Sequence, residues 1–203
     1  MYQSTNPDEL ESHLSCRVLR EEYSHSWYFL SFFNLGVLNY RKDFDRHGVI
    51  YALGTNFGTS SWVNPSSSNA FPTRIIATRS SDEQGSASDL LDIRRGGSLS
   101  GTKDEEKSWW CVDLSEKYAL YLTHYTLRHG RDNGMSIIRN WRLEGSLDGR
   151  TWKLLKKHEN DRGLKEPYPY YTATWCVDGE FGAFRDRKST RLNSSHVKRS
   201  RMP

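Results

Sequence analysis

Hydrophobic and polar positions alternate through the middle of this 203-residue chain. The clearest case is segment 140–152, NWRLEGSLDGRTW, in which apolar Trp141 and Leu143 are each followed by a charged residue before an Asp148-Gly149 pair. A period of two places alternate side chains on opposite faces of a strand. An Asp-Gly pair suits a type I′ turn, whose two central residues both need positive φ. The segment therefore predicts a β-hairpin.

The same pattern predicts further strands between turn-rich loops. Segment 80–108 is a long polar connection, with one helical turn expected near 89–93. Such a long connection is uncommon unless it is functional or mobile. Strands are predicted at 49–53, 74–79, 109–114, 125–128, 141–146, 152–158 and 172–177. Many short strands with little helix indicate a β-sandwich or a barrel. Alternation places Trp109, Trp141 and Trp152 in the core.

Several of these strands carry a family resemblance. SWWCVDL, HYTLRHG, RNWRLEGSLDGRTW and TATWCVDG together resemble a discoidin (coagulation factor 5/8 type C) domain. With DFDRHGVIYALGTNFGTSSWVNP and HENDRGL they are similar to an intracellular branch found in HECT-type ubiquitin ligases and beside BTB domains. The resemblance covers about 43–184 and implies a galactose-binding-like jelly-roll β-sandwich. It also implies a binding module and not an enzyme.

The ends of the chain depart from this pattern. Residues 1–42 are predicted to be a poorly organised N-terminal segment, although the apolar run 27–38 could equally be a buried strand. Residues 43–185 are predicted to form the sandwich, truncated so that at least one closing strand is missing. Residues 186–203 lack apolar periodicity and resemble read-through of a sequencing-library adapter, so a disordered, artefactual basic tail is expected. A disordered tail with a real role is the alternative.

The charge distribution and the cysteines limit the partners and the cellular location that we expect. Residues 186–203 hold six of the 29 basic and one of the 25 acidic residues, so the rest of the chain has a net charge of −1. A basic end run is not a basic binding face, and no nucleic-acid partner is expected. The three cysteines form no Cys-x-x-Cys pair, which favours reduced thiols and a cytoplasmic location. The apolar run 27–38 is too short to span a bilayer, and no membrane insertion is expected.

The tests for catalysis and metal binding point to neither. The chain has no Gly-x-Ser-x-Gly, His-Glu-x-x-His or phosphate-binding glycine loop. Segment 43–48, DFDRHG, copies half of a calcium loop. However, His47 takes the third ligand position and Gly54 the twelfth, where calcium needs a bidentate glutamate. A turn with acidic caps explains the segment better, and no cofactor or metal is predicted.

Two loops offer candidate binding residues at one end of the predicted sandwich. Aromatic faces beside amide and guanidinium donors can recognise a peptide or a sugar. The candidates are Asn56, Phe57, Trp62 and Asn64 in one loop, and Arg128, His129, Arg131 and Arg139 in and after another. The alternatives are that Trp62 plugs the sandwich end and that Arg128 pairs with a buried acid such as Asp113.

The resemblance and the residues together predict a non-catalytic binding module. The first expectation is an intracellular protein-interaction domain that recruits a partner or substrate to a ubiquitin-ligase or BTB-type protein. A HECT ligase carries its catalytic cysteine in a separate domain, and no segment here resembles that domain. The alternative is a carbohydrate-binding, lectin-like domain with a glycan partner.

Overall fold

The computed structural model describes ten segments of the chain. They are residues 16–22, 31–67, 75–94, 100–103, 105–115, 117–129, 137–164, 170–179, 181–184 and 186–191. Residues 16–22, 31–36 and 186–191 are described by their main chain alone. Within these segments, neither helix has the length and apolar character that crossing a membrane requires.

Strands dominate the described residues. In chain order the elements are β1 (Cys16–Glu22), β2 (Ser31–Leu38), α1 (Val49–Gly54), β3 (Ile76–Arg79), the 3₁₀ helix η3 (Ala87–Leu91), β4 (Trp109–Asp113), β5 (Tyr118–Leu122), β6 (His124–Arg128), β7 (Trp141–Ser146), β8 (Lys153–His158), β9 (Thr172–Cys176) and β10 (Asp186–Arg191). The predicted helical turn is η3, whose Ser86 and Asp89 form a reciprocal capping box.

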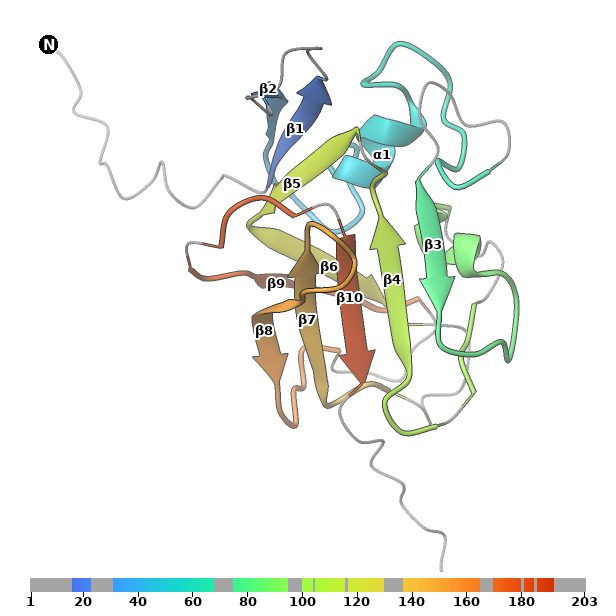
Figure 1. The fold of residues 1–203 in the computed structure, drawn as a ribbon. Coiled ribbons are helices and arrows are strands. Elements are labelled where there is room, and N and C mark those ends of the chain that lie inside the picture. Colours follow the sequence, from blue (N-terminus) through green and yellow to red (C-terminus); the bar gives the residue numbers. More distant parts are fainter. Residues whose placement is uncertain are drawn as a thin grey trace, which may run out of the picture.

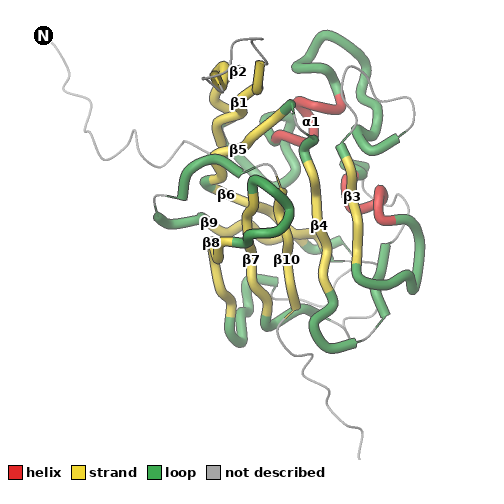
Figure 2. Tube along the Cα trace, in the orientation of Figure 1, coloured by secondary structure: helices red, strands yellow, loops and turns green. Residues whose placement is uncertain are grey.

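The strands form three hydrogen-bonded groups (Figures 1 and 2). A five-stranded sheet has the order β3-β4-β10-β7-β8, while β6 pairs with β9 and a third group has the order β2-β1-β5. Figure 1 shows β6 and β9 crossing behind the five-stranded sheet. The late strand β10 lies between β4 and β7, and such interleaving of distant strands is typical of Greek-key and jelly-roll sandwiches. The predicted all-β sandwich class is confirmed.

Two apolar clusters fill the space between these layers. One joins α1 to β5 through Leu53, Tyr118 and Leu120, with Ile75, Leu91 and Leu114 around them. The other joins β7 and β8 to the opposite layer through Leu143, Leu155, Val177 and Phe184. Gly145 of β7 lies so close to the Phe184 ring that a side chain there would overlap it, with 2.6 Å from an added Cβ to the ring. Close packing of Phe184 therefore requires glycine at this position.

Two local predictions are wrong. Residues 49–53 form one turn of helix instead of a strand, because Ala52 and Leu53 then reach the core from one face while Thr55 closes the turn on the carbonyl of Tyr51. The β7–β8 connection is not a two-residue type I′ turn. Only Gly149 has positive φ, and the Asp148 carboxylate caps the loop by accepting the N–H groups of Arg150 and Thr151.

The expectations for the chain ends also need correction. Residues 16–22, predicted to be poorly organised, form β1, which pairs antiparallel with β2 at 31–38, so the strand alternative for the apolar run 27–38 is the one observed. Residues 186–191, predicted to be disordered, form β10 in the middle of the five-stranded sheet, paired with β4 and β7. Antiparallel pairing uses main-chain groups, so a segment without apolar periodicity can fill a slot between two strands. β10 thereby joins β4 and β7 into one sheet, and the loss of a closing strand stays a prediction.

The tryptophans divide into two classes. Trp141 is fully buried, at 0% exposure, as the alternating pattern predicts. Trp109 and Trp152 are only half-buried: Trp109 is the first residue of β4, and Trp152 lies just before β8 begins. The alternating pattern correctly predicted that Trp141 faces the core. How deeply a side chain is buried also depends on its position along the strand, which the pattern does not show.

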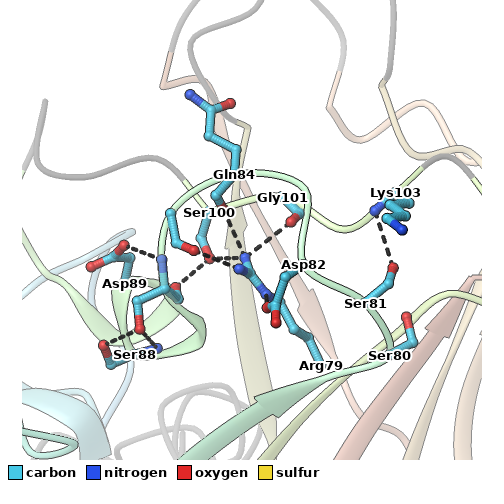
Figure 3. A network of polar contacts seen from close by, with 12 residues as sticks. Arg79, Ser80, Ser81, Asp82, Gln84, Ser88, Asp89, Ser100, Gly101 and Lys103 are labelled. Carbon is cyan, nitrogen blue, oxygen red and sulfur yellow. Dashed lines mark hydrogen bonds and ion pairs between the residues drawn. The ribbon is translucent and has the colours of Figure 1, made fainter.

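Arg79, at the end of β3, organises the long connection 80–108 (Figure 3). Its guanidinium donates to the Asp82 carboxylate (2.6 Å), to the hydroxyl of Ser100 (2.9 Å) and to the carbonyls of Gln84, Gly85 and Gly101. It also lies over the Trp110 ring, and its side chain is 3% exposed. One planar group with five donors thus holds both ends of the loop together.

We expect Trp141→Ala to lower the free energy of unfolding by about 3–5 kcal/mol, because it removes a large buried ring. Urea unfolding followed by circular dichroism measures this change. Leu147→Ala is the control, since Leu147 is 56% exposed and its truncation is expected to cost less than about 0.5 kcal/mol. Equal midpoints for the two variants would place Trp141 outside the core.

We expect Arg79→Lys to cost about 2–4 kcal/mol of stability, because lysine keeps the charge but cannot serve several carbonyls and a carboxylate in one plane. Amide hydrogen exchange should increase in residues 80–94 and 100–103 and stay unchanged in the strands of the sandwich. Arg150→Lys is the control, since Arg150 lies exposed in the β7–β8 loop. Unchanged exchange in Arg79→Lys would contradict the organising role.

Candidate functional site

A chain of hydrogen bonds runs through the interior of the sandwich. Trp141 Nε1 donates to the Tyr125 hydroxyl (3.0 Å), which bonds His158 Nε2 (2.6 Å), and His158 Nδ1 bonds Asp161 Oδ2 (2.6 Å). The Trp141 ring stacks on His158 with centroids 4.0 Å apart, and Trp175 Nε1 donates to Asp161 (3.0 Å). We call these five residues the interior chain. It joins β6, β7, β8, β9 and the loop after β8.

Titration of the interior chain follows from its burial. Burial lowers the pKa of His158, against the opposing bond and charge of Asp161, so the ring stays neutral near pH 7. Burial also disfavours ionised Asp161, but hydrogen bonds from the Gly163 N–H, His158 and Trp175 outweigh it and lower the pKa of Asp161. Burial raises the pKa of Tyr125. A Tyr–His–Asp series could transfer protons in an open cleft, but here the His158 side chain is 3% exposed.

The acidic segment 43–48 acts as a capped turn, as predicted. The Asp43 carboxylate accepts from the hydroxyls of Tyr40 (2.7 Å) and Thr174 (2.5 Å), and Asp45 accepts the N–H groups of Lys42 and His47. In the described part of the chain, no three His, Cys, Asp or Glu residues come close enough together to hold a metal ion. The carboxylates of Asp43 and Asp45 accept hydrogen bonds from donors within the protein.

The candidate residues of the first loop lie at two separate positions in the structure. Asn56 and Phe57 both have positive φ, and the Phe57 ring faces Tyr118 of β5 at 6.3 Å. The Asn56 amide donates to Thr59 within its own turn. Trp62 lies elsewhere, against Gly54 and 5.9 Å from the Arg94 guanidinium carbon.

Asn64 and Arg139 are structural in their contacts. The Asn64 amide donates to the Ser88 carbonyl (3.0 Å) and its oxygen accepts the Ser66 N–H (2.9 Å). Arg139 donates to the carbonyls of Asp161 (3.1 Å) and Leu164 (2.9 Å), which holds the loop after β8. Both side chains satisfy main-chain groups of loops that carry no regular ladder.

The second candidate loop is described only in part. Arg128 donates to the main-chain carbonyls of Arg94 (3.1 Å) and Ile93 (3.5 Å), and its charge helps to lower the pKa of the buried acid Asp92. The Asp113 carboxylate accepts the Ser115 N–H at the end of β4. The His129 side chain is buried, and the main-chain N–H of His129 donates to the Tyr171 carbonyl. Arg131 lies outside the described residues.

The structure brings Trp62 and Arg128 together through residues that the sequence analysis missed. Arg94 lies between them and is bound to the buried carboxylate of Asp92, while Arg128 stacks on Phe44 with 3.5 Å between its guanidinium carbon and the ring centroid. We call Phe44, Trp62, Asp92, Arg94 and Arg128 the Arg94 surface. The sequence feature that could have indicated this surface is the Asp-x-Arg pattern at 92–94. It is hard to recognise because the long polar connection contains many other charged residues.

Comparisons with known proteins place this chain beside parts of much larger ones. No family profile matches it. It is 38% identical over 147 residues, 70% of its length, to an E3 ubiquitin-protein ligase of Drosophila melanogaster, and 38% identical over 151 residues to one of Caenorhabditis elegans. It is 33% identical over 156 residues to a BTB/POZ domain-containing protein of Arabidopsis thaliana. The chain spans 5% of the length of each ligase and 17% of the BTB/POZ protein.

Solved structures show weaker likeness. A Clostridium perfringens CBM32 domain in complex with GalNAc-β-1,3-galactose aligns with 60% of this chain and 86% of its own, at 16% identity and a TM-score of 0.45. A Saccharomyces cerevisiae allantoicase aligns with 59% of this chain and 36% of its own, at 15% identity and a TM-score of 0.40.

We expect the domain to lose stability as the pH falls below about 6.5, the ordinary pKa of histidine, because the unfolded chain then binds a proton that buried His158 resists. The lowered pKa of Asp161 adds a further loss near and below its ordinary value of 3.8. Urea unfolding at several pH values between 7.5 and 5 measures the slope. His158→Gln should flatten it, and an equally steep slope in that variant would contradict the assignment.

Proposed function

We propose that this chain is a non-catalytic binding module that recruits a protein partner to a cytoplasmic ubiquitin-ligase or BTB-type protein. Its 33–38% identity to segments of two ligases and a BTB/POZ protein supports this role. Ubiquitin ligases and a BTB/POZ protein share a segment similar to this chain, so the role of that segment is better explained by binding than by ligase chemistry. The substrates and partners of those whole proteins are not carried over.

The observation that carries the proposal is the Arg94 surface. Phe44 is 39% exposed and the Arg94 side chain is 70% exposed, yet both are fixed by neighbours within the domain. Aromatic and arginine side chains dominate the binding energy of protein interfaces, and fixing them beforehand reduces the entropy lost on association. An exposed but ordered aromatic and arginine surface therefore suits a protein ligand.

The polar interior supports a role without catalysis. Each polar side chain of the interior chain bonds another protein group, and His158 and Trp141 are buried beneath aromatic rings. General acid–base catalysis needs a group within hydrogen-bond reach of a bound substrate. The interior chain instead binds the layers of the sandwich to one another.

We expect the intact chain to select peptides from a random display library and to show no saturable binding on a glycan array. Phe44→Ala should weaken peptide binding about tenfold, roughly 1.4 kcal/mol, because it removes an exposed aromatic contact. Leu147→Ala, which truncates an exposed side chain in the β7–β8 loop, is the matched control. Circular dichroism checks that both variants keep the fold.

Saturable binding to an immobilised glycan without peptide selection would replace this proposal with the carbohydrate-binding alternative. Peptide binding that Phe44→Ala leaves unchanged would keep the protein-binding role but move it away from the Arg94 surface.

A further inference from the structure

Arg94 is held rigidly while most of its guanidinium faces solvent. The Asp92 carboxylate accepts from its Nε (3.0 and 3.1 Å), its Nη2 (2.7 Å) and its main-chain N–H (2.9 Å). The Asp92 side chain is 6% exposed, whereas that of Arg94 is 70% exposed. The Nε side of the guanidinium is thus occupied, and the end formed by Nη1 and the second hydrogen of Nη2 points away from its anchor.

A second arginine adds positive charge beside this pair. Arg128 donates to the Arg94 carbonyl, and after Arg94 itself it helps to lower the pKa of Asp92. The charges of two guanidinium groups therefore act on one buried carboxylate, and these three side chains together carry a net charge of +1. Arg128 is already bonded to carbonyls and stacked on Phe44, so it contributes field more than direct contact.

The backbone at Phe44 indicates that this arrangement is maintained against a cost. Phe44 has a φ of 54°, a left-handed conformation that is unfavourable for a non-glycine residue. Bonds from Tyr40 and Thr174 to neighbouring Asp43 hold the turn, and the Arg128 guanidinium covers the ring. An aromatic wall is thereby kept beside the two arginines.

We propose that the Arg94 surface binds the carboxylate of an acidic residue in an extended segment of the partner, with the outer edge of Arg94 donating two hydrogen bonds. This inference rests on the proposed function and names the chemistry of its ligand. A free arginine edge matches a carboxylate in bidentate geometry. Because the group carries one net positive charge above a buried carboxylate, a singly charged ligand fits it better than a doubly charged phosphate. Trp62, beside Arg94, and Phe44, beside Arg128, supply aromatic faces near this edge.

The test uses the intact chain and three probes in isothermal titration: a short alternating Glu-Gly peptide, its Gln-Gly counterpart and inorganic phosphate. We expect saturable binding of the Glu peptide, weakening with salt. Arg94→Gln should reduce it at least tenfold, and Arg94→Lys several-fold, because lysine keeps the charge but loses the planar fork. Arg150→Gln, an exposed arginine in the β7–β8 loop, should bind as the natural chain does.

Several results would overturn the inference. These are equal binding of the Gln and Glu peptides, unchanged binding in Arg94→Gln, or displacement of the Glu peptide by phosphate beyond that caused by sodium chloride of the same ionic strength. Urea unfolding accompanies each variant, and if Arg94→Gln unfolds because Asp92 loses its partner, Arg94→Lys decides. If the display library yields binders without acidic residues, this inference fails while the proposed function stands. If only glycans bind, both fail.

Discussion

The Asp161 carboxylate is the group on which the rest of the sandwich depends. It lies in the loop after β8 and accepts hydrogen bonds from His158 of β8, Trp175 of β9 and the N–H of Gly163. Through His158 the bonding continues to Tyr125 of β6 and then to Trp141 of β7. Buried polar groups are costly unless every donor and acceptor is paired. Their complete pairing here sets the distance and orientation between the two layers, and the apolar clusters fill the space that results.

Arginine plays a corresponding part at the surface. Arg79 and Arg139 satisfy the carbonyls of loops that have no strand partner, and Arg128 does the same for residues 93 and 94. A guanidinium can serve several acceptors in one plane, so a single side chain orders a stretch of irregular backbone. Arg94 differs, because among the described residues its guanidinium donates to Asp92 alone, and the Arg94 side chain is largely exposed. That difference separates arginines that build the domain from the one best placed to bind a ligand.

A rigid interior and an ordered charged surface fit a recruiting module. Binding through preorganised side chains loses little conformational entropy, and charge gives selectivity and speed of encounter more than raw affinity.

The sequence by itself determined the all-β class, most strand positions and the burial of Trp141, because a period of two is a local property that needs no knowledge of neighbours. It also identified the acidic capped turn at 43–48, where Asp45 accepts the N–H groups of Lys42 and His47 nearby in the chain. Only the tertiary structure decided that 49–53 is helical, that β10 lies between β4 and β7, and that Asn64 and Arg139 hold loops. Each of these depends on contacts between residues distant in sequence. The Arg94 surface exists for the same reason: Phe44, Trp62, Arg94 and Arg128 come from four separate segments, and only folding brings them together.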